Sequence, residues 1–384
     1  MIDIKQIVAQ LSEYCSQENF AGYDPYDGLN SPLTRALSFN LKYGRIAFIQ
    51  AIKRSPLNLR PLLGIKKGHN PKGIGLFLWG YAKLYMADPR LEYLEKIELL
   101  LDLLEQLKST GYSGNCWGYN FDWQSRAFYV PKQTPTIVNS SFIGHALLDT
   151  YLYTGNKKAL QMAIPIKEFI LNDLNRKEDN RTICFSYTPI DHSAVHNANL
   201  LGASLLIRLF RYTDDERLKD AALASLAYTM KYQRPDGSWY YGEAGFHHWV
   251  DSFHTGFNLQ AIRYFLDEGY AEEYQNAYEL GIDYYKNNFF LEDGTPKYYH
   301  DSTYPIDIHS PAQALVFFSC LGAEYRPLSE KIATWMIANM QDQKGYFYFQ
   351  LKPHYTNKIP YMRWAQAWAF HALTEHCLCQ EKDY

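Results

Sequence analysis

The chain has 384 residues, of which 47 % are hydrophobic and 21 % are charged, and its formal net charge is -3 at pH 7. These values exclude a largely disordered chain and provide no basic footprint for nucleic acid. Aromatic residues make up 16 % of the chain, which is consistent either with an aromatic-rich core or with a cleft lined by tyrosine and tryptophan.

The N-terminal residues MIDIKQIVAQLSEYC contain neither a basic region nor a long apolar segment, and the chain has no run of about 18 apolar residues. We therefore expect a cytoplasmic protein without a signal peptide or a membrane span. The six cysteines form no CxxC pair and are expected to be reduced thiols. No HxH or HExxH motif is present, so we expect no metal and no cofactor.

The first 72 residues are expected to form an extension of helices and loops. A short amphipathic helix is predicted over Ile2–Tyr14, and a loop rich in Asp, Asn, Gly and Pro follows at residues 22–32. A second helix is predicted over Leu33–Lys53, and residues 60–72 form a loop with a local basic cluster.

From residue 73 onward, an apolar helix with small residues recurs at intervals of 53 to 64 residues. The predicted apolar helices are Gly73–Met86, Val138–Tyr153, Val195–Phe210, Phe253–Leu266, Pro311–Leu321 and Trp364–His376. More polar helices alternate with them at Leu91–Lys108, Lys157–Leu174, Glu216–Tyr232, Ala271–Asn287 and Ser329–Asp342.

Each polar helix is followed by a turn and a short aromatic piece with β-like character. In four of the five repeats the turn contains glycine, at Gly111 and Gly114 in the first, then at Gly237, Gly294 and Gly345. The aromatic pieces are Trp117–Tyr119, Phe185–Tyr187, Trp239–Tyr241, Tyr298–Tyr299 and Tyr346–Tyr348.

The repeated unit predicts an all-α fold of the (α/α)6 toroid type. A helix that is apolar on most faces is buried, and a two-helix unit cannot bury such a face alone. An open α-solenoid is the alternative, but the long loops between polar and apolar helices favour a closed ring with a cleft on one face. We expect residues 1–384 to form one toroid domain, on which residues 1–72 pack as an extension.

The N-terminal ends of the apolar helices carry the candidate site residues. Three consecutive helices begin with Asp and His, in the segments PIDHSAVH (189–196), VDSFH (250–254) and PIDIH (305–309). Such groups can perform general acid and base catalysis. The candidate catalytic residues are Asp251, His254, His196, His309, Asp191 and Asp122.

Aromatic, amide and basic residues near the same helix ends are candidates for substrate binding. Aromatic rings can stack on sugar faces, and arginine can bind the carboxylate of an acidic sugar. These candidates are Trp117, Trp239, Tyr240, Asn139, Asn197, Arg126, Arg363 and Trp364. Structural roles remain open for the set, because Asp before a helix is a favoured N-cap and a surface salt bridge accounts equally well for an arginine.

Several segments resemble bacterial polysaccharide-biosynthesis proteins from capsule and exopolysaccharide gene clusters, within the six-hairpin glycosidase-like (α/α)6 superfamily. The segments that carry the resemblance are YDPYDGLNS (23–31), RPLLGIKKGHNPKG (60–73), WGYNFDWQSR (117–126), DGSWYYG (236–242), WVDSFHTGF (249–257), PIDIHSPAQAL (305–315) and RWAQAW (363–368). The resemblance implies the toroid fold and a role in making or trimming surface polysaccharide.

A second similarity concerns Trp249-Val250-Asp251-Ser252. It is similar to a segment of unsaturated uronyl hydrolases whose Asp is the catalytic acid/base, which points to Asp251; Asp122 and Asp191 compete as its partner. The segment from Gln233 to Trp239 also resembles repeats of terpene cyclases and prenyltransferases, although the cyclase DxDD motif is absent.

Our first hypothesis is a carbohydrate-active enzyme that hydrolyses, eliminates from or epimerises an oligosaccharide or polysaccharide containing uronic acid. Asp251 would be the acid/base, and a histidine would assist it. A non-catalytic glycan-binding or scaffold protein of a polysaccharide assembly system is the alternative, and a terpene cyclase-like protein is a minor one. The oligomeric state stays open.

Overall fold

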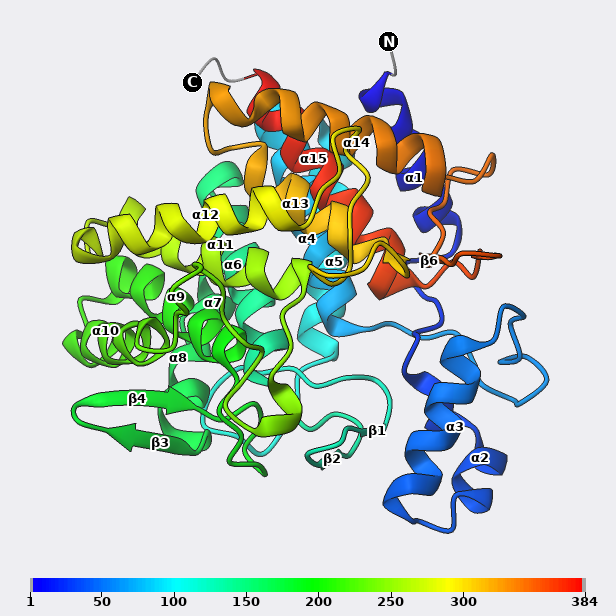
Figure 1. The fold of residues 1–384 in the computed structure, drawn as a ribbon, viewed down its shortest axis with the longest axis horizontal. Helices are drawn as coiled ribbons and strands as arrows, with labels where there is room; N and C mark the ends of the chain where they lie inside the picture. Colours follow the sequence, from blue (N-terminus) through cyan, green and yellow to red (C-terminus); the bar gives the residue numbers. More distant parts are fainter. Residues whose placement is uncertain (1–2, 382–384) are drawn as a thin grey trace. The chain divides into compact units, whose positions relative to one another are not determined.

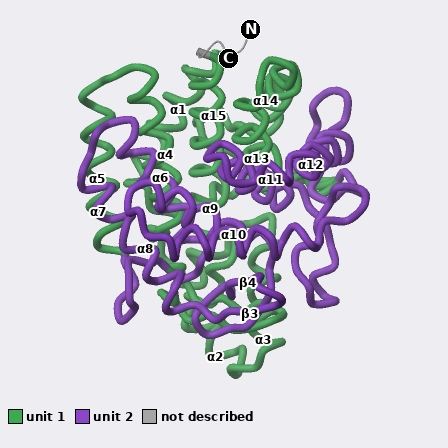
Figure 2. The backbone as a smooth tube through the Cα atoms, turned by 90° about the vertical axis from the view of Figure 1, so that its left-hand side faces the viewer, with its two compact units in different colours: residues 1–107, 118–134, 304–384 green, residues 108–117, 135–303 purple. Residues whose placement is uncertain are grey.

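The computed structural model describes residues 3–381 (Figure 1). Its backbone divides into two units (Figure 2). The first unit contains residues up to 107, residues 118–134 and residues from 304 onward, and the second contains residues 108–117 and 135–303. The expected single domain stays a prediction.

The first unit is built around three buried helices, α4 (Pro71–Ala87), α13 (His309–Phe318) and α15 (Trp368–Glu381). Helix α15 packs against α4 and α13. Each of these three is covered by one further helix. Helix α15 is covered by α1 (Ile4–Gln17), α4 by α5 (Leu91–Gln106) and α13 by α14 (Arg326–Met340). The unit also contains α2 (Pro32–Leu37), α3 (Lys42–Arg54) and the strands β1 (Trp123–Gln124), β2 (Tyr129–Val130), β5 (Ile306–Asp307), β6 (Gln350–Leu351) and β7 (Thr356–Asn357).

The second unit repeats this arrangement. Its buried helices are α6 (Ile137–Thr154), α9 (His196–Thr213) and α11 (Ser252–Asp267), and α9 packs against the other two. The helices that cover them are α7 (Lys157–Ala163), α8 (Ile166–Glu168), α10 (Glu216–Met230) and α12 (Gln275–Asn288). A hairpin of β3 (Arg176–Asp179) and β4 (Thr182–Phe185) packs against α10 through β4.

Burial follows the hydrophobic pattern that the sequence displays. All positions from 71 to 83 in α4 are buried, whereas in α5 only Ile97, Leu100, Leu101 and Leu104 are buried. That spacing places the buried residues of α5 on one helical face. Small residues allow close packing: a Cβ on Gly80 of α4 would lie 2.5 Å from the Phe370 ring of α15. The alternation of apolar and polar helices is therefore confirmed.

The glycine turns adopt one repeated backbone conformation. Gly111, Gly237, Gly294 and Gly345 have φ values of 87°, 90°, 88° and 88°. This left-handed region favours glycine over every residue with a Cβ. The aromatic pieces that follow make isolated β-bridges, such as Asp251 with Tyr299, or remain turns. Only the piece at Phe185 reaches a regular strand, so most of the aromatic pieces are less regular than a strand.

Two predicted helices are interrupted. The segment Leu33–Lys53 is split into α2 and α3, because Phe39 and Asn40 adopt left-handed φ values of 49° and 56° that no α-helix allows. The segment Lys157–Leu174 breaks into α7, α8 and a π-helical turn near Pro165, which lacks the N–H group that a continuous helix requires. The predicted helix start at Ile2 lies outside the described residues.

The expectation of six reduced cysteines is wrong for one pair. Cys320, just after α13, and Cys379 of α15 form a disulfide, with their Cα atoms 5.5 Å apart. The two residues are far apart in sequence and become neighbours only through helix packing.

Within residues 3–381, none of the helices combines the length and the hydropathy that a bilayer crossing requires.

Candidate functional site

The first turn of α11 positions the central pair of the site. Asp251 is the N-cap of this helix, and its carboxylate accepts a 2.9 Å hydrogen bond from the backbone N–H of His254. The backbone is held in place by the aromatic piece of the next repeat, because the Ser252 N–H donates to the Tyr298 carbonyl. The capping geometry therefore fixes Asp251 and His254 on the same side of the helix end.

The two side chains also bond to each other. His254 Nδ1 lies 2.8 Å from one carboxylate oxygen of Asp251 and 3.0 Å from the other. Because an ionised carboxylate only accepts hydrogen bonds, the proton sits on Nδ1 and leaves Nε2 as an acceptor. The Asp251 side chain is fully buried and that of His254 is 19 % exposed. Among residues 3–381, Nε2 has no hydrogen-bond partner.

A small pocket lined by aromatic rings lies beside this pair and is too tightly closed in this structure to hold a water molecule. The rings of Tyr241 and Trp249 stack with centroids 4.4 Å apart, and the Tyr241 ring contacts His254 edge to face at 4.7 Å. Buried Trp239 is oriented by a hydrogen bond from its indole N–H to the Thr229 carbonyl. The lining residues, all in the second unit, are Asn197, Trp239, Tyr240, Tyr241, Trp249, Asp251, His254, Thr255 and Asn258.

Two amides in the lining carry buried oxygens with no hydrogen bond. The Oδ1 atoms of Asn197, on α9, and Asn258, on α11, have no partner within the described chain. Asn139, in the first turn of α6, has neither of its side-chain polar atoms bonded there. Buried polar atoms are almost always hydrogen-bonded in folded proteins, so such groups require an explanation, and a bound polar ligand is one.

Other sequence candidates of the second unit have structural partners. The Asp191 carboxylate accepts hydrogen bonds from the backbone N–H groups of Thr188 at 2.6 Å and Ser193 at 2.8 Å, which closes a local turn. Trp117 is fully buried in the core. His196 packs its ring on Tyr232 with centroids 4.9 Å apart, and burial lowers its pKa to about 4.

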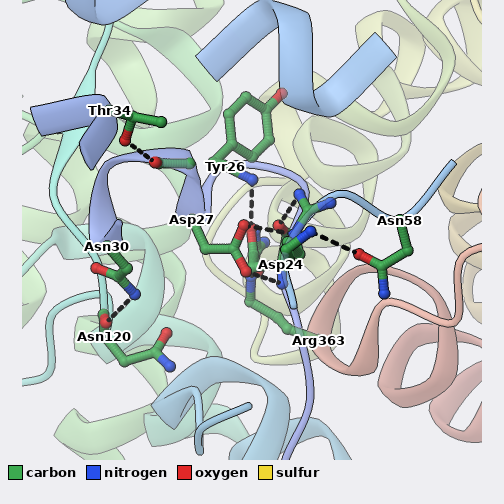
Figure 3. A network of polar contacts seen from close by, with 10 residues as sticks. Asp24, Tyr26, Asp27, Asn30, Thr34, Asn58, Asn120 and Arg363 are labelled. Carbon is green, nitrogen blue, oxygen red and sulfur yellow. Dashed lines mark hydrogen bonds and ion pairs between the residues drawn. The ribbon is translucent and has the colours of Figure 1, made fainter. Parts of the chain in front are cut away.

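In the first unit, Arg363 forms a buried ion pair. Its Nε and Nη2 atoms donate to the two carboxylate oxygens of Asp24 at 2.6 and 2.8 Å (Figure 3). A second pair lies beside it, because Arg60 Nε donates to Asp27 at 2.6 Å and Arg60 Nη2 donates to the Asp24 carbonyl at 2.7 Å. The guanidinium of Arg363 is thus already occupied by a carboxylate of the chain itself.

His309 and Trp364 lie together around Asp307. The Asp307 carboxylate accepts hydrogen bonds from the Trp364 indole at 2.8 Å, from the His309 backbone N–H at 3.0 Å and from Gln350 at 2.5 Å. Burial raises the pKa of Asp307. The rings of His309 and Trp364 meet edge to face at 4.7 Å. This cluster is well packed and supplies an N-terminal anchor for α13.

The remaining two candidates of the first unit lie near its surface loops. Asp122 accepts a 2.7 Å hydrogen bond from the Lys132 backbone N–H and pairs with Arg35 at 2.9 Å. Arg126 is exposed to solvent. The structure therefore joins Asp251, His254, Trp239, Tyr240 and Asn197 in one pocket, and gives several of the other candidates partners of their own.

Sequence reasoning missed Asn258 and gave no site role to Tyr241 or Trp249. Asn258 lies four residues after His254 on α11, so helical spacing could have placed it one turn deeper on the same side. Tyr241 and Trp249 bracket the loop before α11, and the hydrogen bond from the Tyr241 N–H to the Trp249 carbonyl brings them together. No local sequence pattern predicts the contact between Tyr241 and Trp249.

Among residues 3–381, the group with metal-ligand spacing is Cys320, Glu375 and Cys379. Its two sulfur atoms are joined in the disulfide, so the thiolates that a metal would need are not present in this state.

No family model and no curated protein matches the chain. Solved structures do match. Cellobiose 2-epimerase from Spirochaeta thermophila has 14 % sequence identity and a TM-score of 0.62, with 82 % of this chain and 86 % of that chain covered. A GH76 α-mannanase from Bacteroides thetaiotaomicron has 14 % identity and a TM-score of 0.61, with 81 % and 86 % covered.

A third similar structure is an unsaturated glucuronyl hydrolase specific for heparin, with 12 % identity and a TM-score of 0.61 over 83 % of this chain and 89 % of that chain. These structures are six-hairpin glycosidase-like toroids. The chain therefore has the predicted all-α (α/α)6 toroid fold. Because the named proteins catalyse different reactions, the fold does not select one of them.

Proposed function

We propose that the protein is a carbohydrate-active enzyme in which His254 transfers a proton to and from a bound saccharide, with Asp251 holding the imidazole in place. The observation that carries the proposal is the hydrogen bond from His254 Nδ1 to the buried Asp251 carboxylate beside the aromatic pocket. It leaves Nε2 without a proton and able to accept one, as a general base requires. The similar structures named as sugar-processing enzymes support the saccharide as substrate.

The chemistry that suits this pair is proton abstraction from a carbon next to a carbonyl group. Nε2 takes the C–H proton, the electron pair of that bond moves into an enolate, and the Asp251 carboxylate stabilises the imidazolium that forms. Epimerisation requires the enolate to rotate in the site, so that the imidazolium returns the proton to the other face of the carbon. Loss of a leaving group from the neighbouring carbon instead gives an unsaturated sugar.

Hydrolysis is the runner-up within this proposal. Glycoside hydrolysis usually needs two carboxyl groups flanking the scissile bond. Among the described residues that line the pocket, Asp251 is the one carboxylate, and both of its oxygens face His254. The role expected for Asp251 from the sequence, direct acid/base catalysis, is therefore reassigned in this proposal to His254, and Asp251 becomes its positioning residue.

Recognition of the sugar is assigned to the amides and rings around the pair. The unbonded oxygens of Asn197 and Asn258 can accept hydrogen bonds from sugar hydroxyls, and Trp239 and Trp249 offer apolar ring surface. No Lys or Arg belongs to the described lining of this pocket, so a neutral sugar ring at this position suits it best. A uronic acid elsewhere in the substrate, and a role in surface polysaccharide synthesis, remain part of the proposal through the sequence resemblance.

A non-catalytic glycan-binding protein is the second candidate. The aromatic pocket and the amides serve binding equally well, and Asp251 caps α11 in either case. Binding alone does not require the second hydrogen bond, from His254 Nδ1 to the Asp251 carboxylate. The two readings therefore differ in what the pair Asp251–His254 contributes.

The experiment is a screen of the purified protein against neutral and acidic oligosaccharides, with turnover and binding measured separately. The wild type is compared with Asp251→Asn and His254→Asn. The exposed His300, in the same unit, provides the control His300→Asn. Asn at position 251 can still cap α11, so the fold should persist.

We expect both pair variants to bind the saccharide and to lose turnover by about 10²–10⁴-fold, while the control keeps wild-type rates. Binding without turnover in every protein would favour the scaffold. Turnover that is indifferent to both pair variants would refute the assigned roles.

A further inference from the structure

The N-terminal part of the chain has a charge distribution unlike the rest. Between Gly28 and Ala87 there is no Asp or Glu, although the whole chain has a net charge of -3. The same stretch contains ten basic residues, namely Arg35, Lys42, Arg45, Lys53, Arg54, Arg60, Lys66, Lys67, Lys72 and Lys83. Four of them pair with carboxylates from outside the stretch, namely Arg35, Arg60, Lys67 and Lys83. A positive local potential therefore comes from the remaining ones, among them Lys42 and Arg54.

Helices α2 and α3 form a hairpin in this basic segment (Figure 1). The hairpin packs on the 3₁₀ turn Asp27–Asn30 and on β1. Large apolar side chains at its turn face solvent: Phe39 is 77 % exposed, Leu41 64 % and Tyr43 79 %. Leu33 and Leu37 of α2 are exposed as well. Several large apolar side chains exposed on one hairpin indicate an interaction surface.

Basic residues accompany the apolar ones on the exposed side of α3. Tyr43, Ala47, Ala51 and Arg54 are all exposed, and their spacing places them on one helical face. Within the described residues, neither Lys42 nor Arg54 has an ion-pair partner. The face thus combines aromatic and aliphatic groups at one end with uncompensated positive charge at both ends.

We propose that the α2–α3 hairpin docks the protein on an anionic lipid bilayer surface. In this arrangement Phe39, Leu41 and Tyr43 enter the boundary between headgroups and acyl chains, and Lys42 and Arg54 contact the anionic headgroups. Exposed Phe, Leu and Tyr combined with Lys and Arg form the pattern of helices that lie in a membrane interface. A second copy of the chain is disfavoured as the occupant, because it would present the same positive charge.

An open hollow lies beside the apolar tip, lined by Asn30, Pro32, Arg35, Ala36, Phe39 and Asn40. The docking proposal is independent of the proposed function, since it uses none of the residues around Asp251.

The test is co-sedimentation of the full chain with vesicles of phosphatidylcholine alone and of phosphatidylcholine mixed with phosphatidylglycerol, at low and high salt. The apolar variant is Phe39→Ser with Leu41→Ser, and the charge variant is Lys42→Glu with Arg54→Glu. Leu152→Ser with Leu291→Ser is the matched control, because both leucines are exposed in the second unit. Circular dichroism verifies that each variant is folded.

We expect binding to the anionic vesicles that high salt weakens, and roughly a tenfold or larger loss of affinity in each hairpin variant, with the control unchanged. Absence of binding at low salt, or binding that the hairpin variants retain, would overturn the proposal. Sedimentation velocity tests whether a second copy of the chain binds the hairpin instead. A wild-type dimer that dissociates in the apolar variant, together with no vesicle binding, would overturn the proposal and identify the hairpin as an interface between copies.

Discussion

Replacing Arg363 by methionine tests whether this residue is structural or free to bind a ligand. Its guanidinium donates two hydrogen bonds to Asp24, at 2.6 and 2.8 Å, and the two side chains are 3 % and 5 % exposed. Removing the cation leaves the Asp24 carboxylate buried without its main partner. Breaking a buried pair in this way costs about 3–5 kcal/mol, a large fraction of a typical total stability of about 5–15 kcal/mol.

The assay is urea unfolding followed by circular dichroism, on the wild type, Arg363→Met, Asp24→Asn and the double variant. We expect the double variant to be less destabilised than the sum of the single ones, because each single change already breaks the pair. Arg126→Met is the control, since Arg126 is exposed, and its effect should stay within about 0.5 kcal/mol. An Arg363→Met protein of wild-type stability that binds saccharide more weakly would refute the structural role.

Two further predictions concern stability. Burial lowers the pKa of His196 and His376 to about 4. It also lowers the pKa of His145 and His371 well below the ordinary value. The unfolded chain therefore binds more protons, so the free energy of unfolding should fall as pH drops from about 6.5 toward 4, by up to about 1.4 kcal/mol per pH unit per histidine; in His196→Gln this slope should be shallower than in the exposed control His300→Gln, and identical slopes would contradict it. Reducing the Cys320–Cys379 disulfide should lower the free energy of unfolding by about 2–4 kcal/mol. Urea unfolding with and without reductant measures this loss. The control is Cys320→Ser, whose stability reductant should leave unchanged.

The periodic part of the fold was predictable because burial on helices follows a simple spacing. The stripe of Ile97, Leu100, Leu101 and Leu104 on α5 can be read directly from the sequence, and so can the glycine turns. The split of Leu33–Lys53 was not predictable from periodicity, since the apolar pattern continues across Phe39 and Asn40 while their backbone turns left-handed. Local conformation overrode the pattern there.

For the site, contacts between residues close in sequence were predictable and contacts between distant residues were not. Asp251 and His254 are three residues apart, so one helix turn suffices to bring them together, and the sequence identified both. The partner of Arg363 is Asp24, which is 339 residues away, and only the packed fold brings them into contact. The contact between Tyr241 and Trp249 likewise depends on how one loop closes.

The most direct test of the central claim follows deuterium from solvent into a saccharide that the protein turns over. The reaction is run in heavy water with wild type, His254→Asn, Asp251→Asn and the control His300→Asn, and product is examined by NMR. For an epimerisation, proton transfer by His254 predicts deuterium at the carbon next to the carbonyl with wild type and control, none with His254→Asn, and incorporation slowed by about 10²–10⁴-fold with Asp251→Asn. For an elimination it predicts an unsaturated product, with the same dependence on the two variants. Turnover that gives neither deuterium at that carbon nor an unsaturated product, or undiminished incorporation by His254→Asn, would contradict the claim.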